Sequence, residues 1–422
     1  MILVVNNEKL KQVQFDEKLN MKKVIIVGGG AAGFFTAINA KETNPDLEVT
    51  ILEKGKEVLQ KVKISGGGRC NVTHACFEPK ELVKFYPRGE KELLGPFHQF
   101  MTGDTFEWFE QRGIPLKIES DNRVFPESNS SQTIIDCFLN AVDDLGIPVV
   151  KNCGVTAIEK QDNQWKVITK TQEFIADKVV VAAGSSKKVW ELAETLDHTI
   201  VPPVPSLFTF NIKDSRIKDL LGISVPNASV KLVDTKLEAY GPLLITHWGL
   251  SGPAVLKLSA FGARILAEKQ YSYKVEVNWL SRPTDKIVNV LLNLKKKQPK
   301  KQVALRSPFE EIPKRLWERF VIASQIKGTQ NWADLSHQQI ESLANQITKC
   351  GFQGNGKSTF KEEFVTAGGI DLKEINFKRF ESRKHENLFF VGEVLNIDAV
   401  TGGFNFQNAW TGAYIVAKAI AK

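Results

Sequence analysis

Three glycines, Gly28, Gly30 and Gly33, directly follow the short apolar run Val24–Val27. Their spacing, G-x-G-x-x-G, is typical of a chain that leaves a buried strand, turns tightly and opens a helix. The N–H groups at such a helix start can bind a pyrophosphate. Glu53 ends the next predicted strand, 20 residues after Gly33, where a carboxylate can accept both ribose hydroxyls of an adenosine and would repel a 2′-phosphate. The pattern therefore predicts FAD or NAD rather than NADP. The expected contacts are Gly28, Gly30, Ala31, Ala32, Gly33, Glu53 and Lys54.

A second glycine-rich stretch, Ser65–Asn71, reads SGGGRCN. Three consecutive glycines allow the backbone to lie flat against a ligand. Arg69 could offset negative charge on a phosphate or a reduced flavin ring, and Asn71 could hydrogen-bond the ring or the ribityl chain. An ordinary surface loop is the alternative. We expect Cys70 to be a small buried thiol, because its spacing to Cys76 does not match a C-x4-C redox pair. The expected cofactor contacts are Gly67, Gly68, Arg69 and Asn71.

A third stretch combines Gly392–Asp398 with Thr401–Asn405, at the end of a predicted strand and the start of a predicted helix. Backbone N–H groups at a glycine-led helix start could face the pyrimidine edge of a flavin, which becomes anionic on reduction. A plain strand–helix turn is the alternative. The buried strand Val179–Ala183 closes at Gly184. The expected contacts are Ala183, Gly184, Gly392, Glu393, Gly402, Gly403, Phe404 and Asn405.

The elements that position these loops follow from hydrophobic spacing. Val24–Val27 and Val179–Ala183 are fully apolar, as in central strands of a parallel sheet. Short alternating segments within residues 155–176 predict an antiparallel meander between such strands. Residues 206–278 are rich in predicted strands and residues 284–350 in predicted helices. A strand near 387–391 and a helix near 404–420 then return the chain to the nucleotide-binding core.

Composition narrows the class of protein. The chain has 422 residues, 42% of them hydrophobic and 25% charged, with no apolar run long enough for a membrane helix. The five cysteines form no CxxC and no regular framework, which predicts a cytoplasmic protein without a metal site. The net charge is +8, and we interpret the basic stretch as a solvated loop or, alternatively, a phosphate-binding arm for RNA. That stretch contains Lys295, Lys296, Lys297, Lys300 and Lys301.

The chain resembles the HI0933-like (BaiN-like) family of bacterial flavoproteins within the two-dinucleotide-binding-domain group. The matching blocks are GGGAAG at 28–33, SGGGRCN at 65–71, RVFP at 123–126, THWGLSGP at 246–253, VTAGGIDL at 365–372 and GEVLNIDAVTGGFNFQNAW at 392–410. The resemblance implies an α/β fold: a discontinuous Rossmann-type FAD-binding domain with an inserted β-rich domain and a helical subdomain. The expected boundaries are 1–20 (tail), 21–202 (first FAD part), 203–283 (β-rich), 284–350 (helical), 351–365 (return) and 366–422 (second FAD part).

The THWGLSGP block lies in the predicted inserted domain and contains a candidate catalytic histidine. His247 could donate or accept a proton near neutral pH, although a histidine that merely closes a turn is at least as common. Arg123 and Phe125 of the RVFP block would line the substrate side. One departure from the family pattern is Ser185–Lys188, which runs directly into a predicted helix and removes an expected flavin-side loop. Gly351–Ser358 matches the letters of a P-loop, but a polar helix rather than a buried strand precedes it, so we set it aside.

Three functions stay open. The first is an FAD-dependent oxidoreductase that reduces an activated C=C or C=O of a small molecule with electrons from NAD(P)H. The second is a flavoenzyme that reduces a uracil base in ribosomal RNA, since the resemblance covers members tied to that reaction and others tied to a steroid enone. The third is a non-catalytic FAD-binding protein. Only one strand-linked G-x-G-x-x-G occurs, so NAD(P)H would visit transiently. The oligomeric state is left open.

Overall fold

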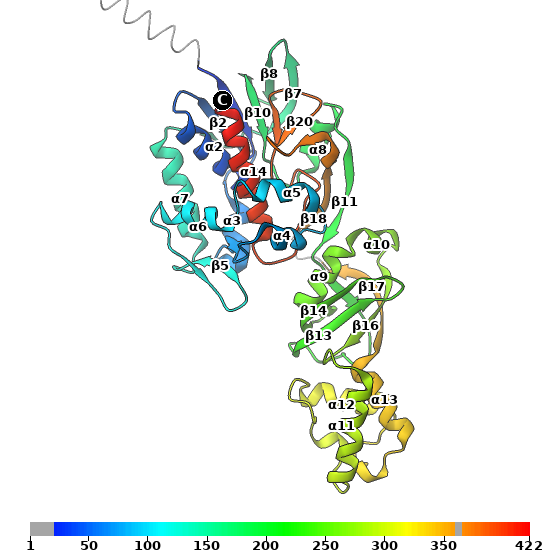
Figure 1. Cartoon of the computed structure of the whole chain (residues 1–422). Coiled ribbons are helices and arrows are strands. Elements are labelled where there is room, and N and C mark those ends of the chain that lie inside the picture. Colours follow the sequence, from blue (N-terminus) through cyan, green and yellow to red (C-terminus); the bar gives the residue numbers. More distant parts are fainter. Residues whose placement is uncertain (1–20, 359–364) are drawn as a thin grey trace, which may run out of the picture. The chain divides into compact units, whose positions relative to one another are not determined.

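The computed structural model describes residues 21–358 and 365–422, which form two compact units (Figure 1). Unit 1 contains the described residues up to Pro203 and those from Gly368 onward, and unit 2 runs from Val204 to Ala367. The predicted tail, residues 1–20, lies outside the described residues. Among the described helices, none has the length and apolar character needed to cross a bilayer.

Unit 1 is built on a seven-stranded sheet in the order β19-β20-β21-β10-β1-β2-β6. The pairings from β21 to β6 are parallel, whereas β19 and β20 pair antiparallel at one edge. The central strand β1 is buried along Val24–Val27, as expected of a parallel strand covered on both faces. The strands are β1 (Lys23–Val27), β2 (Glu48–Leu52), β6 (Val149–Val150), β10 (Lys178–Val181), β19 (Ile375–Asn376), β20 (Glu381–Ser382) and β21 (Leu388–Phe390). Because β21 comes from the far end of the chain, the predicted discontinuous Rossmann-type domain is confirmed.

Helices α2 (Ala31–Thr43) and α14 (Phe404–Ile420) pack against each other in unit 1 (Figure 1). An aromatic cluster fixes this packing, with Phe35 lying 5.2 Å from Trp410 and 4.6 Å from Trp108 between ring centroids. The remaining helices of the unit are α3 (Gln60–Gly68), α4 (Pro79–Leu82), α5 (Glu90–Phe97), α6 (Thr102–Glu110), α7 (Ser131–Asp144) and α8 (Lys187–Glu194), with short 3₁₀ turns at Val83–Phe85 and Leu372–Glu374.

Two small antiparallel sheets complete unit 1. One has the order β3-β5-β4 and connects Thr73–His74 (β3) to the hairpin of Leu116–Ile118 (β4) and Arg123–Pro126 (β5). The other is the predicted meander, formed by β7 (Val155–Gln161), β8 (Gln164–Thr169) and β9 (Glu173–Ala176). A separate pair, β11 (Ile200–Ser206) and β18 (Val365–Ile370), contains both points at which the two units divide.

Unit 2 contains a closed six-stranded barrel in the order β12-β15-β14-β13-β16-β17. Its strands are β12 (Thr209–Ile212), β13 (Ser224–Leu232), β14 (Glu238–Ile245), β15 (Gly249–Ser251), β16 (Ser272–Asn278) and β17 (Cys350–Ser358), with helices α9 (Pro253–Phe261) and α10 (Ala263–Glu268) beside them. The P-loop-like letters Gly351–Ser358 lie along β17, which pairs with β16 and β12. The segment therefore lacks the buried strand, glycine loop and helix that form a P-loop.

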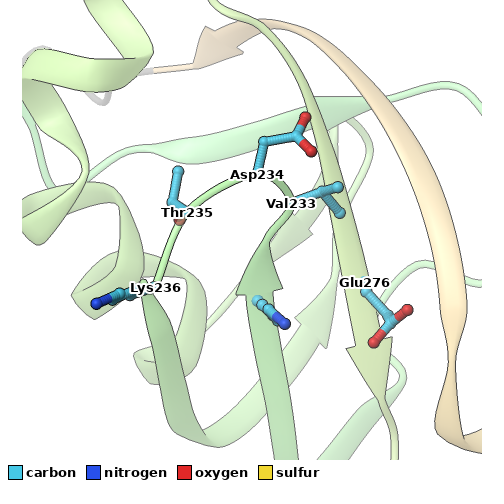
Figure 2. A pocket seen from close by; sticks show the side chains of 6 residues that line it. Val233, Asp234, Thr235, Lys236 and Glu276 are labelled. Atoms are coloured by element: carbon cyan, nitrogen blue, oxygen red, sulfur yellow. The ribbon is translucent and has the colours of Figure 1, made fainter.

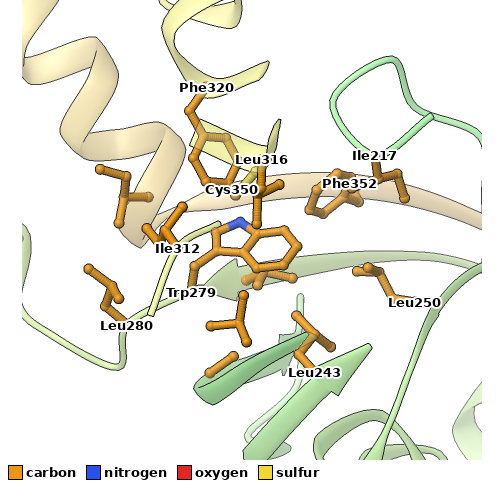
Figure 3. Packing of buried hydrophobic residues seen from close by; sticks show 14 of the residues in the cluster. Ile217, Leu243, Leu250, Trp279, Leu280, Ile312, Leu316, Phe320, Cys350 and Phe352 are labelled. Carbon is orange, nitrogen blue, oxygen red and sulfur yellow. The ribbon is translucent and has the colours of Figure 1, made fainter. Parts of the chain in front are cut away.

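The helical part of unit 2 shares one core with the barrel. Trp279 is fully buried just after β16. Its ring centroid lies 5.6 Å from that of Phe320 in the helices and 6.3 Å from that of Phe352 in the barrel (Figure 3). The helices are α11 (Thr284–Lys297), α12 (Lys314–Ala323) and α13 (His337–Thr348), with 3₁₀ turns at Val303–Leu305 and Trp332–Asp334. One interpretation was wrong: Lys295–Lys297 form the last turn of α11 rather than a loop, and Lys295 donates to the Leu335 carbonyl.

Candidate cofactor site

The first glycine motif connects β1 to α2 with the geometry that a dinucleotide requires. Gly28 has φ +118° and a Cβ there would lie 2.6 Å from the Ala182 carbonyl oxygen; a Cβ on Gly33 would lie 2.0 Å from the Gly28 carbonyl oxygen. Both positions therefore need glycine for chain packing. Gly30 differs, because a Cβ there would meet nothing within 4 Å. The backbone at Gly30 is thus open on the side from which a ligand could approach.

The start of α2 keeps its N–H groups available. Gly30 is the N-cap, and no side chain caps the helix. The first helical hydrogen bond runs from Phe34 N to Gly30 O, at 3.1 Å, so the N–H groups of Ala31, Ala32 and Gly33 have no partner within the helix. Uncapped N–H groups together with the positive end of the helix dipole form an anion site. This arrangement fits a pyrophosphate.

Glu53 directly follows β2 and is held in place by the same loop. Its carboxylate accepts from Gly29 N at 2.8 Å and from Gly55 N at 2.7 Å, one bond to each oxygen. The side chain is half-buried, and each oxygen keeps a second lone pair. The carboxylate can therefore accept two ribose hydroxyls. Lys54, the next residue, is exposed.

The SGGGRCN stretch forms an irregular turn at the end of α3. Gly66, Gly67 and Gly68 all have positive φ, and a Cβ on Gly67 or Gly68 would meet nothing within 4 Å. These two exposed glycines present bare backbone, as the sequence predicts. Cys70 is fully buried and burial raises its pKa to about 12, against a smaller lowering by a hydrogen bond to Ser65. The predicted inert thiol fits this environment.

Arg69 and Asn71 are both engaged within the chain. The Arg69 guanidinium donates to Glu119 at 2.6 Å and lies 3.9 Å from the centroid of the Phe125 ring. Asn71, with its amide nitrogen facing two carbonyls, donates to Val124 O and Thr73 O and accepts from Gly403 N at 3.0 Å. Asn71 thus connects the second motif to the third. Its oxygen keeps one lone pair for a ligand.

The third motif surrounds the start of α14. Gly403, at φ +93°, is the N-cap, and a Cβ there would lie 2.4 Å from the Thr73 carbonyl oxygen. Phe404 stacks on Phe85 with centroids 4.2 Å apart, and the Asn405 amide oxygen accepts from Ala399 N at 3.0 Å. No side chain caps α14. Its start therefore offers free N–H groups, like the start of α2.

Lys61 connects the turns after β10 and β21, and the sequence analysis missed it. Its ammonium pairs with the Glu393 carboxylate and lies 3.4 Å from the Ser185 hydroxyl. A Cβ on Gly184 would come within 3.9 Å of a Glu393 oxygen, so these two turns lie close together. No motif marks Lys61, because its two contacts are separated from it by 124 and 332 positions.

The side-chain oxygen of Asn396, in the loop that follows Glu393, is buried and has no hydrogen-bond partner among the described residues. The first and third motifs follow the parallel strands β1 and β21, at the carboxyl ends where such sheets bind dinucleotides. The contacts of the individual residues with FAD stay predictions.

The predicted substrate-side residues have different surroundings. Arg123 pairs with Asp121 at 2.7 Å and Phe125 is fully buried under Arg69. His247 lies in unit 2, exposed in the turn between β14 and β15, beside the 57% exposed Trp248. A catalytic role for His247 stays a prediction. Helix α8 begins at Lys187, three residues after Gly184, with Ser186 at the N-cap position, which confirms that Ser185–Lys188 runs directly into a helix. No group of three or more metal-ligand side chains occurs in the described ranges.

Comparison with known proteins assigns the family. A family model described as the HI0933-like protein Rossmann domain matches residues 22–419. The ribosomal RNA dihydrouridine synthase of Haemophilus influenzae is 29% identical over 412 residues, covering 94% of this chain and 98% of that protein. The 3-dehydro-bile acid delta(4,6)-reductase of Clostridium scindens is 26% identical over 412 residues, covering 95% and 100%. Among solved structures, the 3-ketosteroid delta1-dehydrogenase of Sterolibacterium denitrificans matches with a TM-score of 0.48 and 11% identity, covering 95% and 99%.

The fold and the site define a dinucleotide-binding flavoprotein, an FAD-dependent oxidoreductase. The chain belongs to the HI0933-like family, which the sequence blocks predicted. This membership supports an enzyme over a non-catalytic FAD-binding protein.

Proposed function

We propose that this protein is a reductase that uses FAD to add hydrogen across a C=C bond conjugated to a carbonyl, with electrons from NAD(P)H. The observation that carries the proposal is the open backbone at Gly30 and the uncapped start of α2, beside the held Glu53 carboxylate. These three features together suit the adenosine diphosphate half of a dinucleotide.

The residues of unit 1 would divide the work of holding FAD. The start of α2 would bind the pyrophosphate, and Glu53 would accept from the ribose of the adenosine. The start of α14, held by the hydrogen bond from Gly403 N to Asn71, would face the pyrimidine edge of the flavin. FAD, when bound, would supply hydride transfer. Lys61 would hold the turns at Gly184 and Glu393 together.

The proposed substrate class rests on what two relatives share. A delta(4,6)-reductase of a 3-dehydro-bile acid and a dihydrouridine synthase both saturate a C=C bond conjugated to a carbonyl. Such a bond accepts hydride at its β-carbon and a proton at its α-carbon, so a proton donor is needed near the substrate. His247 is our candidate for that donor.

A direct test uses purified protein under anaerobic conditions. We expect yellow protein with one FAD per chain, bleached by NADH or NADPH and reoxidised by a 3-keto-4-ene steroid or by RNA that lacks dihydrouridine. Product formation is measured as a gain of two hydrogen atoms by mass spectrometry. A colourless protein that does not take up added FAD would end the proposal. FAD that neither nucleotide reduces would remove the proposed electron donor and leave the FAD site standing.

The second candidate function is reduction of uracil in ribosomal RNA. The name of the Haemophilus influenzae relative and of the 28% identical Escherichia coli relative supports it. The identity of the electron acceptor distinguishes this function from small-molecule reduction. If the protein reduces uracil in RNA, RNA should reoxidise the reduced flavin and the steroid enone should not.

A further inference from the structure

The net positive charge of the protein is confined to unit 2. Of the 56 Lys and Arg and 48 Asp and Glu residues of the chain, 24 and 14 lie between Val204 and Ala367. Unit 2 therefore carries a net charge of +10 and the rest of the chain −2. This asymmetry places any long-range attraction for a polyanion on unit 2 rather than on the unit that holds the candidate cofactor site.

One surface of unit 2 combines cations with exposed apolar side chains. We call it the Trp248 surface. It contains three exposed large apolar residues, Trp248 at 57%, Leu221 at 51% and Ile322 at 63% exposure. The other members are Lys213, Lys218, His247, Arg315 and Arg319.

Hydrogen bonds bring the chain segments that carry these residues next to one another. Ile212 N donates to Trp248 O at 2.9 Å, which places Lys213 beside the β14–β15 turn. Gly222 N donates to Ile245 O at 3.0 Å, which brings Leu221 to the same turn. The backbone carbonyls of Lys218 and Asp219 accept from two arginines of α12, Arg319 and Arg315. Arg315, Arg319 and Ile322 share one helix face, since they are spaced by four and three residues.

The charge balance of the Trp248 surface is positive. Four cations belong to it, Lys213, Lys218, Arg315 and Arg319, and Asp219 is the acidic residue between them. The neighbouring Asp214 is paired with Arg216 at 2.6 Å, and Arg216 also donates to the Gly351 carbonyl. Glu318 lies 3.7 Å from Lys314. Cations around an exposed indole suit a chain with phosphates and unpaired bases.

We propose that the Trp248 surface binds single-stranded RNA, with Trp248 stacking on an unpaired base and the surrounding cations contacting phosphates. The proposal rests on the second candidate function, because it names where an RNA substrate would be held. A duplex would offer its phosphates but no exposed base face, so single strands should bind more tightly than duplexes of equal length.

The test measures binding of the full-length FAD-loaded protein to a fluorescent uridine-rich RNA of about 15 nucleotides, by anisotropy. Trp248→Ala should weaken binding about 5- to 150-fold, the range that loss of one stacked base produces. Trp248→Phe should restore most of it. Replacing Lys213 and Lys218 by Gln should lower the slope of log K against log salt concentration by about 1.4, or about 0.7 for each phosphate contact on a single strand.

Matched controls lie elsewhere on the same barrel. Tyr240, 62% exposed on β14, controls for Trp248, and Lys231 and Lys236 control for the lysine pair. Those two lysines line a shallow pocket with Asp234 and Glu276, so their charges are balanced (Figure 2). Tyr240→Ala and the Lys231→Gln/Lys236→Gln variant should bind RNA as the unchanged protein does.

Two results would overturn the proposal. One is absence of RNA binding by a protein that still reduces a steroid enone, which would leave the reductase function intact. The other is binding that responds equally to the control variants, or only to Lys296, Lys297, Lys300 and Lys301, which would move the contact off the Trp248 surface. Because the anisotropy assay needs no turnover, a failure of FAD uptake or of reduction would be scored separately from RNA binding.

Discussion

The substitution Gly30→Ala tests whether glycine is required at this position by a bound ligand or by the folded chain. A Cβ at Gly30 would meet nothing within 4 Å, and its backbone, at φ −97° and ψ −171°, suits any L-residue. The substitution should therefore leave the folded chain undisturbed. If a pyrophosphate lies against this backbone, the new methyl group occupies the space of the ligand.

The expected magnitudes differ strongly for folding and for binding. Replacing glycine by alanine at an N-cap costs at most about 1 kcal/mol of unfolding free energy. Displacing the pyrophosphate from the N–H groups of α2 removes at least one hydrogen bond to a charged group, about 1.5–3 kcal/mol. That corresponds to FAD binding about 10- to 100-fold weaker, since 1.4 kcal/mol is a factor of ten.

The assay titrates FAD into protein stripped of cofactor, following flavin fluorescence, with thermal unfolding measured alongside. Gly95→Ala is the matched control, because a Cβ there also meets nothing within 4 Å and the residue lies in α5 rather than in a cofactor loop. Gly33→Ala is the contrasting variant, because its Cβ would lie 2.0 Å from Gly28 O and should cost about 1–3 kcal/mol of stability. Unchanged FAD affinity in Gly30→Ala would refute the pyrophosphate assignment.

Three further predictions concern the surroundings of the site. Gly403→Ala should lose about 2–4 kcal/mol of unfolding free energy, because φ is +93° and the new Cβ would lie 2.4 Å from Thr73 O. It should also bind FAD more weakly; urea unfolding and FAD titration measure the two effects. Unchanged stability would contradict the claim that the chain requires glycine at this position. Lys61→Gln should change the unfolding free energy by less than about 1 kcal/mol, because the Lys61 side chain is 53% exposed. It should lower the flavin midpoint potential on the order of 10–20 mV, because Glu393 loses its cation. A raised potential would count against the pairing of Lys61 with Glu393 near the flavin. Burial raises the pKa of Glu374, but hydrogen bonds from Lys384, Thr199 and His198 outweigh it and lower that pKa from 4.5 to about 2. Glu374 therefore contributes about 3 kcal/mol of unfolding free energy above pH 4.5, and this stability is lost as the pH falls toward 2. Burial also lowers the pKa of His198, so the protein should begin to lose stability below pH 6.5. Urea midpoints of Glu374→Gln should fall less between pH 4.5 and 2 than those of the unchanged protein, and parallel curves over that range would contradict it.

The parallel core could be predicted from the sequence because its information is local. Apolar runs at Val24–Val27 and Val179–Ala183 predicted strands, observed at Lys23–Val27 and Lys178–Val181, and glycine spacing predicted the turn into α2. The last turn of α11 was predicted as a loop, although its residues favour a helix. Lysine is a good helix former, three lysines suit the negative end of a helix dipole, and the first proline follows only at Pro299.

The partners of charged site residues could not be predicted, because they depend on how distant segments meet. Arg69, a predicted cofactor contact, pairs with Glu119, which the β4–β5 hairpin brings to it from 50 positions away. Lys61, in α3, pairs with Glu393, which lies 332 positions further along the chain. Residue type indicates that a charge needs a partner, but tertiary structure decides which one.

The glycines of the three motifs therefore serve two different purposes. Gly28, Gly33 and Gly403 are required by the chain itself, since a Cβ on each would lie within 2.6 Å of a backbone oxygen. Gly30, Gly67 and Gly68 meet no such neighbour. For Gly67 and Gly68 the positive φ gives a conformational reason for glycine, but at Gly30 neither packing nor backbone conformation requires it. Gly30 is thus the motif glycine whose identity an approaching ligand best explains, and its substitution tests the cofactor site without disturbing the fold.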